Sequence, residues 1–454
     1  MIKVIQFGEG NFLRAFVDHY FESLNREGGE YEVSIVKPIA MGDLSRFAAA
    51  GNEWNVVLRG FEGVSATKIS CVGQMIDPFT DDAPYFALAG DKELKIIVSN
   101  TTEAGIRFDS SDRPEAFPNV SYPAKLTRFL MARYEALGDE GGVYLMPVEL
   151  IDKNADNLFE CVEKYAELWG LSEGFKKWNR ERNFYCNTLV DRIVSGYPKT
   201  PEDIESTDAA VGYHDPLVTI GEHFGLWAVE KKGNISDYIK EGHHGIDVVL
   251  SESIDYYKKR KVRVLNGSHT NLVAYGLLSG METVFDCMND KTLSTFVYET
   301  LKEEINPFVS DDLSATEKFA DEVVTRFKNP YLNHRLISIS LNSISKWAAR
   351  DLPSFDDYYK ANGRIPEKLT IGFSYLLALY ISARKVGDEY KVDLPYGTEQ
   401  LIDTPEYLEY FTGGGSVKGF MARADVFGAD LTEYEGFYEA VLENLRKITD
   451  YKGE

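Results

Sequence analysis

The stretch KVIQFGEGNFLR, residues 3–14, decides how the rest of the chain is interpreted. Residues 3–7 form a short, mainly apolar run that is typical of a strand, and residues 12–24 have apolar side chains at helical spacing. Gly8 and Gly10 lie between the two. A strand, a glycine-bearing turn and a helix in this order indicate a fold in which a parallel sheet alternates with helices.

The two glycines suit a dinucleotide phosphate. Gly8 permits a tight turn, and Gly10 lets backbone N–H groups at the helix N-terminus approach a pyrophosphate. Leu13 stands where a third glycine is usual, so the motif is incomplete and an ordinary structural turn is the alternative. Arg14 adds a cation either near the cofactor or in a surface salt bridge.

The second expected strand, residues 32–36, is followed by Lys37 and Pro38. Dinucleotide folds that use NAD usually place Asp or Glu here, for the ribose 2′-hydroxyl. The first acidic residue after the strand is Asp43. The residues alone therefore leave NAD and NADP open, and Lys37 could face a 2′-phosphate.

Further strands and helices alternate along the first half. We expect strands at 55–58, 69–76, 94–99 and 143–148, a helix at 124–137, and an inserted hairpin around Val57 and Ile69. From about residue 253 the segments become long and helical: 256–280, 290–304, 314–327, 332–349, 369–383 and 434–448. The prediction from the residues is an α/β protein with an open, mostly parallel N-terminal domain (1–250), followed by a mainly α-helical domain (251–454).

Composition excludes several classes of function. The 454 residues include 49 basic and 72 acidic ones, a net charge of −23, which argues against nucleic acid or an anionic membrane as partner. Four scattered cysteines and isolated histidines give no metal-ligand spacing, so we expect no metal and a reducing, cytoplasmic location. No signal peptide and no membrane-spanning apolar run is expected.

The stretch 261–269, KVRVLNGSH, is the most informative one for chemistry. At about 100° per residue on an α-helix, Asn266 lies about 140° and His269 about 80° around the axis from Lys261. An amine, an amide and an imidazole within one arc suit carbonyl reduction, which needs a proton donor and neutral groups that stabilise the alkoxide. A solvated helix face is the alternative. Asn187, beside an apolar run, is a second candidate donor or a turn residue.

These stretches resemble the polyol-specific long-chain dehydrogenases, the mannitol dehydrogenase family. The matching elements are Gly8-x-Gly10-x-Phe12-x-Arg14, Asn187-x-x-Val-Asp-Arg-Ile193, Lys261-x4-Asn266-Gly-x-His269 and Arg326-Phe-x-Asn-Pro330. Within the family, residues 6–16, 99–105 and 339–346 look most like the members that interconvert D-tagaturonate and D-altronate. Phe16 stands where the polyol members usually have histidine.

The resemblance implies an NAD-linked, metal-independent hydride transfer in a cleft between a Rossmann-type and a helical domain. Lys261 would be the general acid/base, Asn187 and Asn266 the oxyanion donors, and His269 a substrate-orienting residue. Cofactor contacts are expected from Phe7, Gly8, Gly10, Asn11, Phe12, Arg14 and Asn100, and Arg335 and Lys346 are candidates for the substrate carboxylate. The alternatives are fructuronate reduction, mannitol oxidation, and a non-catalytic dinucleotide sensor on the same fold.

Overall fold

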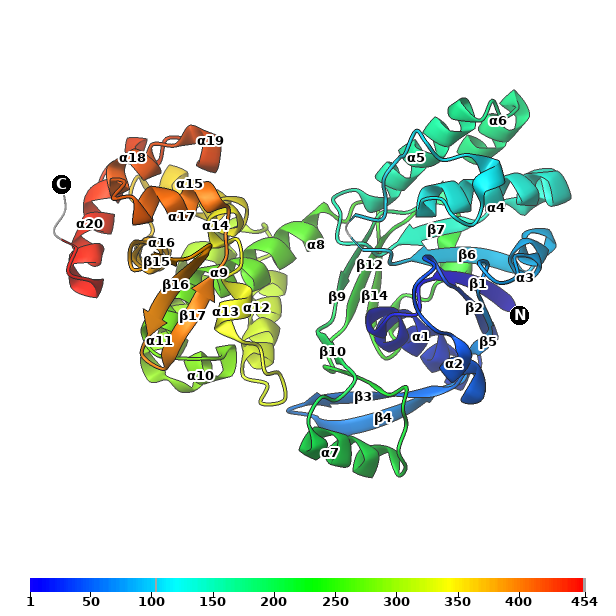
Figure 1. Ribbon diagram of the computed structural model, residues 1–454, viewed down its shortest axis with the longest axis horizontal. Coiled ribbons are helices and arrows are strands. Elements are labelled where there is room, and N and C mark those ends of the chain that lie inside the picture. Colours follow the sequence, from blue (N-terminus) through cyan, green and yellow to red (C-terminus); the bar gives the residue numbers. More distant parts are fainter. Residues whose placement is uncertain (103, 452–454) are drawn as a thin grey trace. The chain divides into compact units, whose positions relative to one another are not determined.

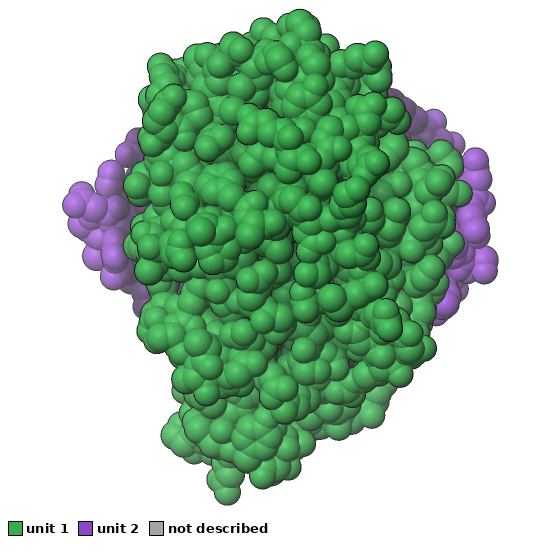
Figure 2. Space-filling model, turned by 90° about the vertical axis from the view of Figure 1, so that its right-hand side faces the viewer, with its two compact units in different colours: residues 1–254 green, residues 255–454 purple. Residues whose placement is uncertain are grey.

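The computed structural model describes residues 1–102 and 104–451 and has two compact units, Met1–Ile254 and Asp255–Glu454 (Figure 2). Unit 1 is built on a six-stranded sheet with strand order β5-β2-β1-β6-β7-β8, in which all neighbours are parallel (Figure 1). These strands are β1 (Ile2–Phe7), β2 (Tyr31–Val36), β5 (Val72–Ile76), β6 (Leu94–Ser99), β7 (Tyr144–Pro147) and β8 (Phe184–Tyr185).

The strand order reverses between β1 and β6, which lie side by side although β2 and β5 come between them in sequence. Ligands of open parallel sheets bind outside the carboxyl ends of the strands at such a reversal. The Gly8 turn follows β1 there, and Asn100 follows β6. The expected parallel sheet is therefore confirmed, and it brings two predicted site segments together.

Helices cover both faces of this sheet, because side chains alternate along each strand. Val4 packs in the core on the α1 side, whereas Ile5 and Phe7 belong to the core on the side of α4 and α5. The helices of unit 1 are α1 (Asn11–Arg26), α2 (Ser45–Ala49), α3 (Ala83–Ala87), α4 (Tyr122–Leu137), α5 (Asn154–Leu168), α6 (Glu173–Arg182) and α7 (Pro201–Val211).

Two smaller four-stranded sheets complete unit 1. The expected hairpin is confirmed as β3 (Trp54–Gly60) and β4 (Gly63–Ile69), which continue into β11 and β10. The expected single strand 69–76 is wrong: the chain leaves β4 at Ile69 and enters the main sheet at Val72. Between them, the Ser70 N–H donates to Glu22 Oε2 (2.8 Å). The remaining strands are β9 (Thr188–Asp191), β10 (Val194–Gly196), β11 (Thr219–Gly221), β12 (Leu226–Glu230), β13 (Gly242–His243) and β14 (Asp247–Ser251).

Arg192, the last residue of the Val190-Asp191-Arg192 segment, is buried and hydrogen-bonded to backbone carbonyls of the core. Its guanidinium donates to the carbonyls of Ala15 on α1 (2.7 Å), Phe224 (3.0 Å) and Gly245 (2.6 Å). Burial lowers the pKa of Arg192 to about 10, so the side chain stays charged at neutral pH. One arginine thus ties α1 to the loops that precede β12 and β14.

Unit 2 is mainly helical, as expected. A long helix comprises α8 (Asp255–Arg260), a π-helical segment (Lys261–Gly267) and α9 (Ser268–Leu278). The expected helix 332–349 is interrupted at Asn342, which has a positive φ of 55°. The other helices are α10 (Val284–Asn289), α11 (Lys291–Glu299), α12 (Leu313–Phe327), α13 (Leu336–Ile339), α14 (Ser343–Arg350), α15 (Leu352–Asn362), α16 (Glu367–Ile381), α17 (Pro405–Thr412), α18 (Val417–Met421), α19 (Ala424–Phe427) and α20 (Phe437–Ile448).

A small antiparallel sheet in unit 2 was not expected from the sequence. It consists of β15 (Arg384–Val386), β16 (Glu389–Leu394) and β17 (Gly397–Leu401). These strands are short and polar, so they lack the apolar runs that mark the strands of unit 1. None of the helices in the described part of the chain has the length and hydrophobicity needed to span a membrane.

We expect Phe16→Ala to lower the free energy of unfolding of unit 1 by about 3–5 kcal/mol, the usual cost of an aromatic cavity. Phe16 is 0% exposed and lies against Phe12 (ring centroids 5.0 Å apart) and Trp227 (5.8 Å). Phe61→Ala, at a position that is 60% exposed in the same unit, is the matched control. It should change the value by no more than about 0.5 kcal/mol in urea titrations. Equal effects of the two substitutions would contradict this core.

Candidate functional site

The turn after β1 requires glycine at position 8. Gly8 has a φ of +121°, and a Cβ there would lie 3.0 Å from Leu13 Cδ1 and 3.3 Å from the Asn100 carbonyl oxygen. The Asn100 N–H donates to the Phe7 carbonyl (3.1 Å). Leu13 therefore fills the space above the turn, and the loops after β1 and β6 touch directly.

The N-terminus of α1 is open. Gly10 precedes the helix, no side chain caps it, and a Cβ at this position would meet nothing within 4 Å. The first-turn N–H groups and the helix dipole of α1 thus face free space, the arrangement that binds phosphate groups. The segment fits the pyrophosphate of a dinucleotide.

Gln6 and Asp18 support the Gly8 turn through hydrogen bonds from the protein interior. Neither residue was predicted from the sequence. Gln6 Nε2 donates to the Gly8 carbonyl (3.1 Å) and to Asp18 Oδ2 (3.3 Å). Both residues are 0% exposed, and burial raises the pKa of Asp18 to about 7. A glutamine within the otherwise apolar strand 3–7 was the available sign of this arrangement.

Arg14 points into the protein. Its guanidinium donates to the Leu217 carbonyl and to Asn11 Oδ1, and it lies over the rings of Phe47 (5.5 Å) and Trp54 (5.7 Å). Arg14 is therefore not part of a surface salt bridge. Through Asn11, which is exposed at the start of α1, it can support a cofactor indirectly; a direct contact stays a prediction.

A cavity of about 570 Å³ is bordered by the loop after β6, the loop that also touches the glycine turn at Gly8. Loops that follow β2, β5 and β6 line it, with Pro38, Phe79 and Thr101 among them. Glu149 fixes one of these loops by accepting from the Thr101 N–H (2.9 Å). The cavity lies at the carboxyl ends of the strands, where the adenosine half of a dinucleotide is held in such sheets.

Asn187 is buried, and its amide has a fixed orientation. Its Oδ1 accepts from the N–H groups of Ala155 (3.0 Å) and Asp156 (3.2 Å) at the start of α5. Its Nδ2 donates to Glu230 Oε2 (3.0 Å), which also pairs with Lys232 (3.0 Å). The amide oxygen is thus held by the helix, and its N–H side is directed toward a charged group. Glu230 and Lys232 could not be linked to Asn187 from the sequence, since they lie more than forty residues away.

In unit 2, Lys261 and Asn266 lie on the π-helical segment rather than on a regular α-helix. A π-helix joins residues five apart by its hydrogen bonds. Asn266 follows Lys261 by five positions, so the two lie closer to one line along the helix than the expected 140° separation. Both residues are half-buried. Gly267 ends the segment, and a Cβ there would lie 2.8 Å from the buried Asp351 Oδ1.

His269 follows on the first turn of α9 and is 7% exposed. Its ring stacks on Phe327 (centroids 4.1 Å apart) and meets His334 edge-on (5.1 Å). Burial, and then the positive potential of His334, Arg326, Arg350 and Lys346, lowers the pKa of His269 well below its usual value. The ring is therefore neutral, and within the described residues its Nε2 has no hydrogen-bond partner.

His334 and three cations lie around His269; the cations Arg326, Lys346 and Arg350 are called the cation cluster, whereas burial lowers the pKa of His334 and favours its neutral form. Lys346 Nζ donates to the Ile339 carbonyl (2.9 Å), and Arg350 Nη1 donates to Thr270 Oγ1 (3.2 Å). Burial lowers the pKa of both cations. Lys346 was expected from the sequence, whereas His334 and Arg350 were missed.

Arg335, the other expected carboxylate ligand, has an acidic partner. Its Nη2 donates to Glu399 Oε1 at 2.6 Å, and its side chain is 44% exposed. Its role stays a prediction, and the cation cluster offers the better-placed positive charges.

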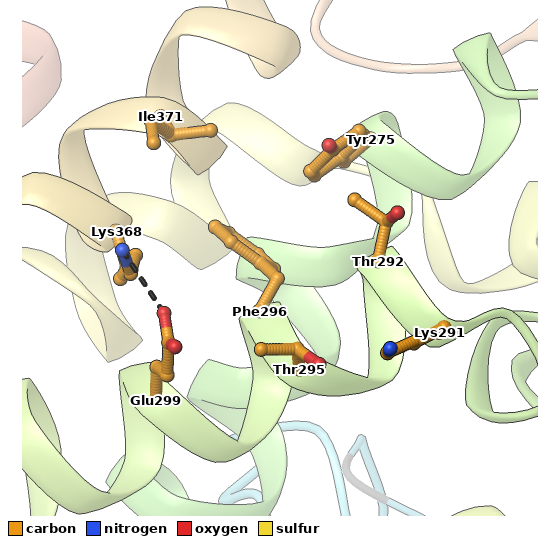
Figure 3. Close-up of a pocket in the computed structure, with 8 residues that line it drawn as sticks. All are labelled: Tyr275, Lys291, Thr292, Thr295, Phe296, Glu299, Lys368 and Ile371. Carbon is orange, nitrogen blue, oxygen red and sulfur yellow. Dashed lines mark ion pairs between the residues drawn. The ribbon is translucent and has the colours of Figure 1, made fainter.

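A smaller cavity of about 350 Å³ lies in unit 2 (Figure 3). Tyr275, Phe296 and Ile371 line it, and Lys368 pairs with Glu299 (3.0 Å) at one side. None of the predicted site residues lines this cavity. In the described ranges, 1–102 and 104–451, no group of three or more His, Cys, Asp and Glu side chains is arranged to hold a metal.

Comparison with protein families places the chain. The model of the mannitol dehydrogenase Rossmann domain matches residues 2–239, and that of the mannitol dehydrogenase C-terminal domain matches residues 253–449. The chain therefore belongs to the mannitol dehydrogenase family.

Two relatives are similar over nearly the whole chain, and both are named altronate oxidoreductase. The one from Bacillus subtilis (strain 168) is 38% identical and covers 98% of this chain and 92% of its own length. The one from Escherichia coli O1:K1 / APEC is 36% identical, and the match covers 99% of this chain and 94% of that relative.

Two solved structures share the fold at 19% sequence identity. D-sorbitol dehydrogenase in substrate-free form has a TM-score of 0.81 and covers 100% of this chain and 94% of its own. Pseudomonas fluorescens mannitol 2-dehydrogenase, a ternary complex with NAD and D-mannitol, has a TM-score of 0.68 and covers 98% and 92%.

We expect alanine at positions 8 and 10 to have different effects. Gly8→Ala strains the positive φ and crowds Leu13, so it should lower both the unfolding midpoint and the affinity for NADH. Gly10→Ala should leave the midpoint unchanged and weaken NADH binding by about tenfold, because its methyl group fills the space above the helix N-terminus. Thermal unfolding and NADH fluorescence titration measure the two quantities. Unchanged NADH affinity in Gly10→Ala would contradict pyrophosphate binding at this turn.

Proposed function

We propose that this protein is an NAD-dependent tagaturonate reductase, which interconverts D-tagaturonate and D-altronate without a metal. The observation that supports it most directly is an amine and an amide, Lys261 and Asn266, on one π-helical turn beside a neutral His269 and the cation cluster. The two altronate oxidoreductases that resemble the chain over its full length support the same substrate pair.

The reduction needs a hydride for the ketone carbon and a proton for its oxygen. When bound, NADH supplies the hydride. The Lys261 ammonium releases the proton to the oxygen, which becomes the alcohol of altronate, and Lys261 is left as the neutral amine. In the reverse direction, the amine takes the proton back.

Neutral donors stabilise the oxygen as its negative charge develops. Asn266 presents an amide from the same helical turn as Lys261, and Asn187 presents a second amide whose orientation is set by α5 and Glu230. Preorganised N–H donors of this kind stabilise an oxyanion without reorganising during the reaction. His269 Nε2, buried and neutral, is available to bind a substrate hydroxyl.

The substrate also has a carboxylate, which requires positive charge in an acidic protein. The cation cluster supplies it: Lys346 and Arg350 lie on α14, and Arg326 lies on α12. We assign the carboxylate to Lys346, since its half-buried amine donates to a neutral backbone carbonyl, that of Ile339 (2.9 Å). Partial burial strengthens a charge pair relative to one in bulk water.

Lys261→Met should lower kcat for tagaturonate reduction by about 10²–10⁴-fold, the usual contribution of a general acid, with NADH affinity unchanged. Lys259→Met is the matched control, because it removes a lysine two residues away and should retain turnover. Steady-state assays at 340 nm and NADH fluorescence titration give both values. Wild-type turnover in Lys261→Met would refute the assignment.

Lys346→Met should raise the KM for tagaturonate by about tenfold or more, because a charge-assisted hydrogen bond is lost, while NADH affinity stays the same. Lys385→Met, an exposed lysine paired with Glu409, is the control and should leave both unchanged.

The same assay should include fructuronate and fructose. Preference for fructuronate or fructose would replace the substrate assignment with a sister reaction of the family. NADH binding with no oxidation by any keto sugar would favour the non-catalytic sensor.

A further inference from the structure

The end of β2 has a lysine where NAD-binding folds usually have an acid, and the structure shows what that lysine does. β2 and β5 are parallel neighbours with Val36 opposite Ile76, so Lys37 and Asp77 leave the sheet side by side. Lys37 Nζ lies 2.9 Å from Asp77 Oδ2. The Lys37 side chain is 5% exposed, whereas that of Asp77 is 26% exposed. The carboxylate, and not the amine, is therefore the accessible member of this pair.

Asp77 has a fixed orientation. Its Oδ1 accepts from the Phe79 N–H (3.0 Å), while Oδ2 binds Lys37. Phe79 then lines the cavity bordered by the loop after β6. The Asp77 carboxylate, hydrogen-bonded to the backbone of a residue that lines this cavity, has both oxygens held and is preorganised to accept a further hydrogen bond.

Other acidic groups lie at the same corner. A Cβ at Gly42 would be 3.1 Å from Glu9 Oε1 and 3.9 Å from Lys37 Cε, so Glu9 of the glycine turn is close to the lysine stem. Hydrogen bonds from Ser45 lower the pKa of Asp43, and the nearby charges of Arg46 and Lys37 lower it further. Glu9, Asp43 and Asp77 thus outnumber Lys37 and Arg46.

Two more cations, Lys125 and Arg107, line the cavity together with two more acids, Asp109 and Asp112. Lys125 is 3% exposed, and its Nζ donates to the Val120 carbonyl. Arg107 lies beside Asp109, whose pKa it helps to lower. The corner that receives the ribose therefore offers a carboxylate to a hydroxyl and excess negative charge to a phosphate.

We infer that Asp77, held by Lys37, accepts the adenosine ribose 2′-hydroxyl and sets the preference for NAD over NADP. The neighbouring strand thus supplies the acid that β2 lacks. A 2′-phosphate is repelled by Asp77 and Glu9, and it can reach Lys37 only by breaking a buried ion pair. The inference rests on the proposed function for the identity of the cofactor and adds the residue that selects it.

The test is a fluorescence titration of purified protein with NADH and with NADPH, without sugar acid. Wild type should bind NADH at least tenfold more tightly than NADPH. Asp77→Asn should reduce the ratio of NADH affinity to NADPH affinity at least tenfold. NADH should bind more weakly, and NADPH should bind more tightly because Lys37 is released from its ion pair. Asp82→Asn, which removes an exposed charge that is not paired with Lys37, should keep the wild-type ratio within twofold.

The double variant K37M/D77N addresses the case in which an unpaired Lys37 prevents folding. It should lose the tighter NADPH binding of the single variant but keep its weak NADH binding. If folded Asp77→Asn keeps the wild-type ratio of NADH to NADPH affinity, this inference is overturned and the proposed function is not. If Asp77→Asn does not fold, the same result in the double variant overturns it. Wild-type protein that binds neither nucleotide overturns the proposed function as well. Failure to reduce tagaturonate, with the ratios as expected, overturns only the substrate assignment.

Discussion

The π-helical segment Lys261–Gly267, with its hydrogen bonds between residues five apart, is the constraint on which the catalytic assignment depends. In a regular α-helix, Lys261 and Asn266 point in directions about 140° apart, at the two ends of one broad arc. The π-helical segment adds one residue to the turn and draws the two together. π-Helical segments are rare and are frequently found at functional sites, although this chain has a second one at Thr300–Ile305. Gly267, which admits the Asp351 carboxyl against the backbone, allows the segment to end within the core.

Charge is distributed unevenly in this acidic chain. Its net charge is −23, yet four cationic or potentially cationic side chains gather around His269. Burial keeps the His269 ring neutral, so it can serve as a hydrogen-bond partner without adding to the cluster's charge. In unit 1, by contrast, carboxylates gather at the ribose corner. We propose different partners for the two units on this basis: a substrate anion for unit 2 and a ribose hydroxyl for unit 1.

The sequence predicted the parallel sheet because its strands are short apolar runs separated by a glycine turn and amphipathic helices. It could not predict the π-helical segment, because α- and π-helices bury nearly the same residues over a single turn. The hydrogen-bond partners of Asn187 could not be predicted either, since Glu230 and the start of α5 contact it only in the folded chain. Lys37 was ambiguous for the same reason: its acid comes from β5, forty residues later. Catalytic roles for Lys261, Asn187, Asn266 and His269 remain hypotheses that kinetics must test.

Chemical rescue tests the central claim, proton donation by the Lys261 amine, most directly. Tagaturonate reduction by Lys261→Ala would be followed with increasing concentrations of methylammonium and, separately, tetramethylammonium ions. The account predicts that methylammonium restores turnover and that tetramethylammonium, which has no proton to give, does not. Equal stimulation by both ions would show that position 261 supplies only charge or volume, and would contradict the account.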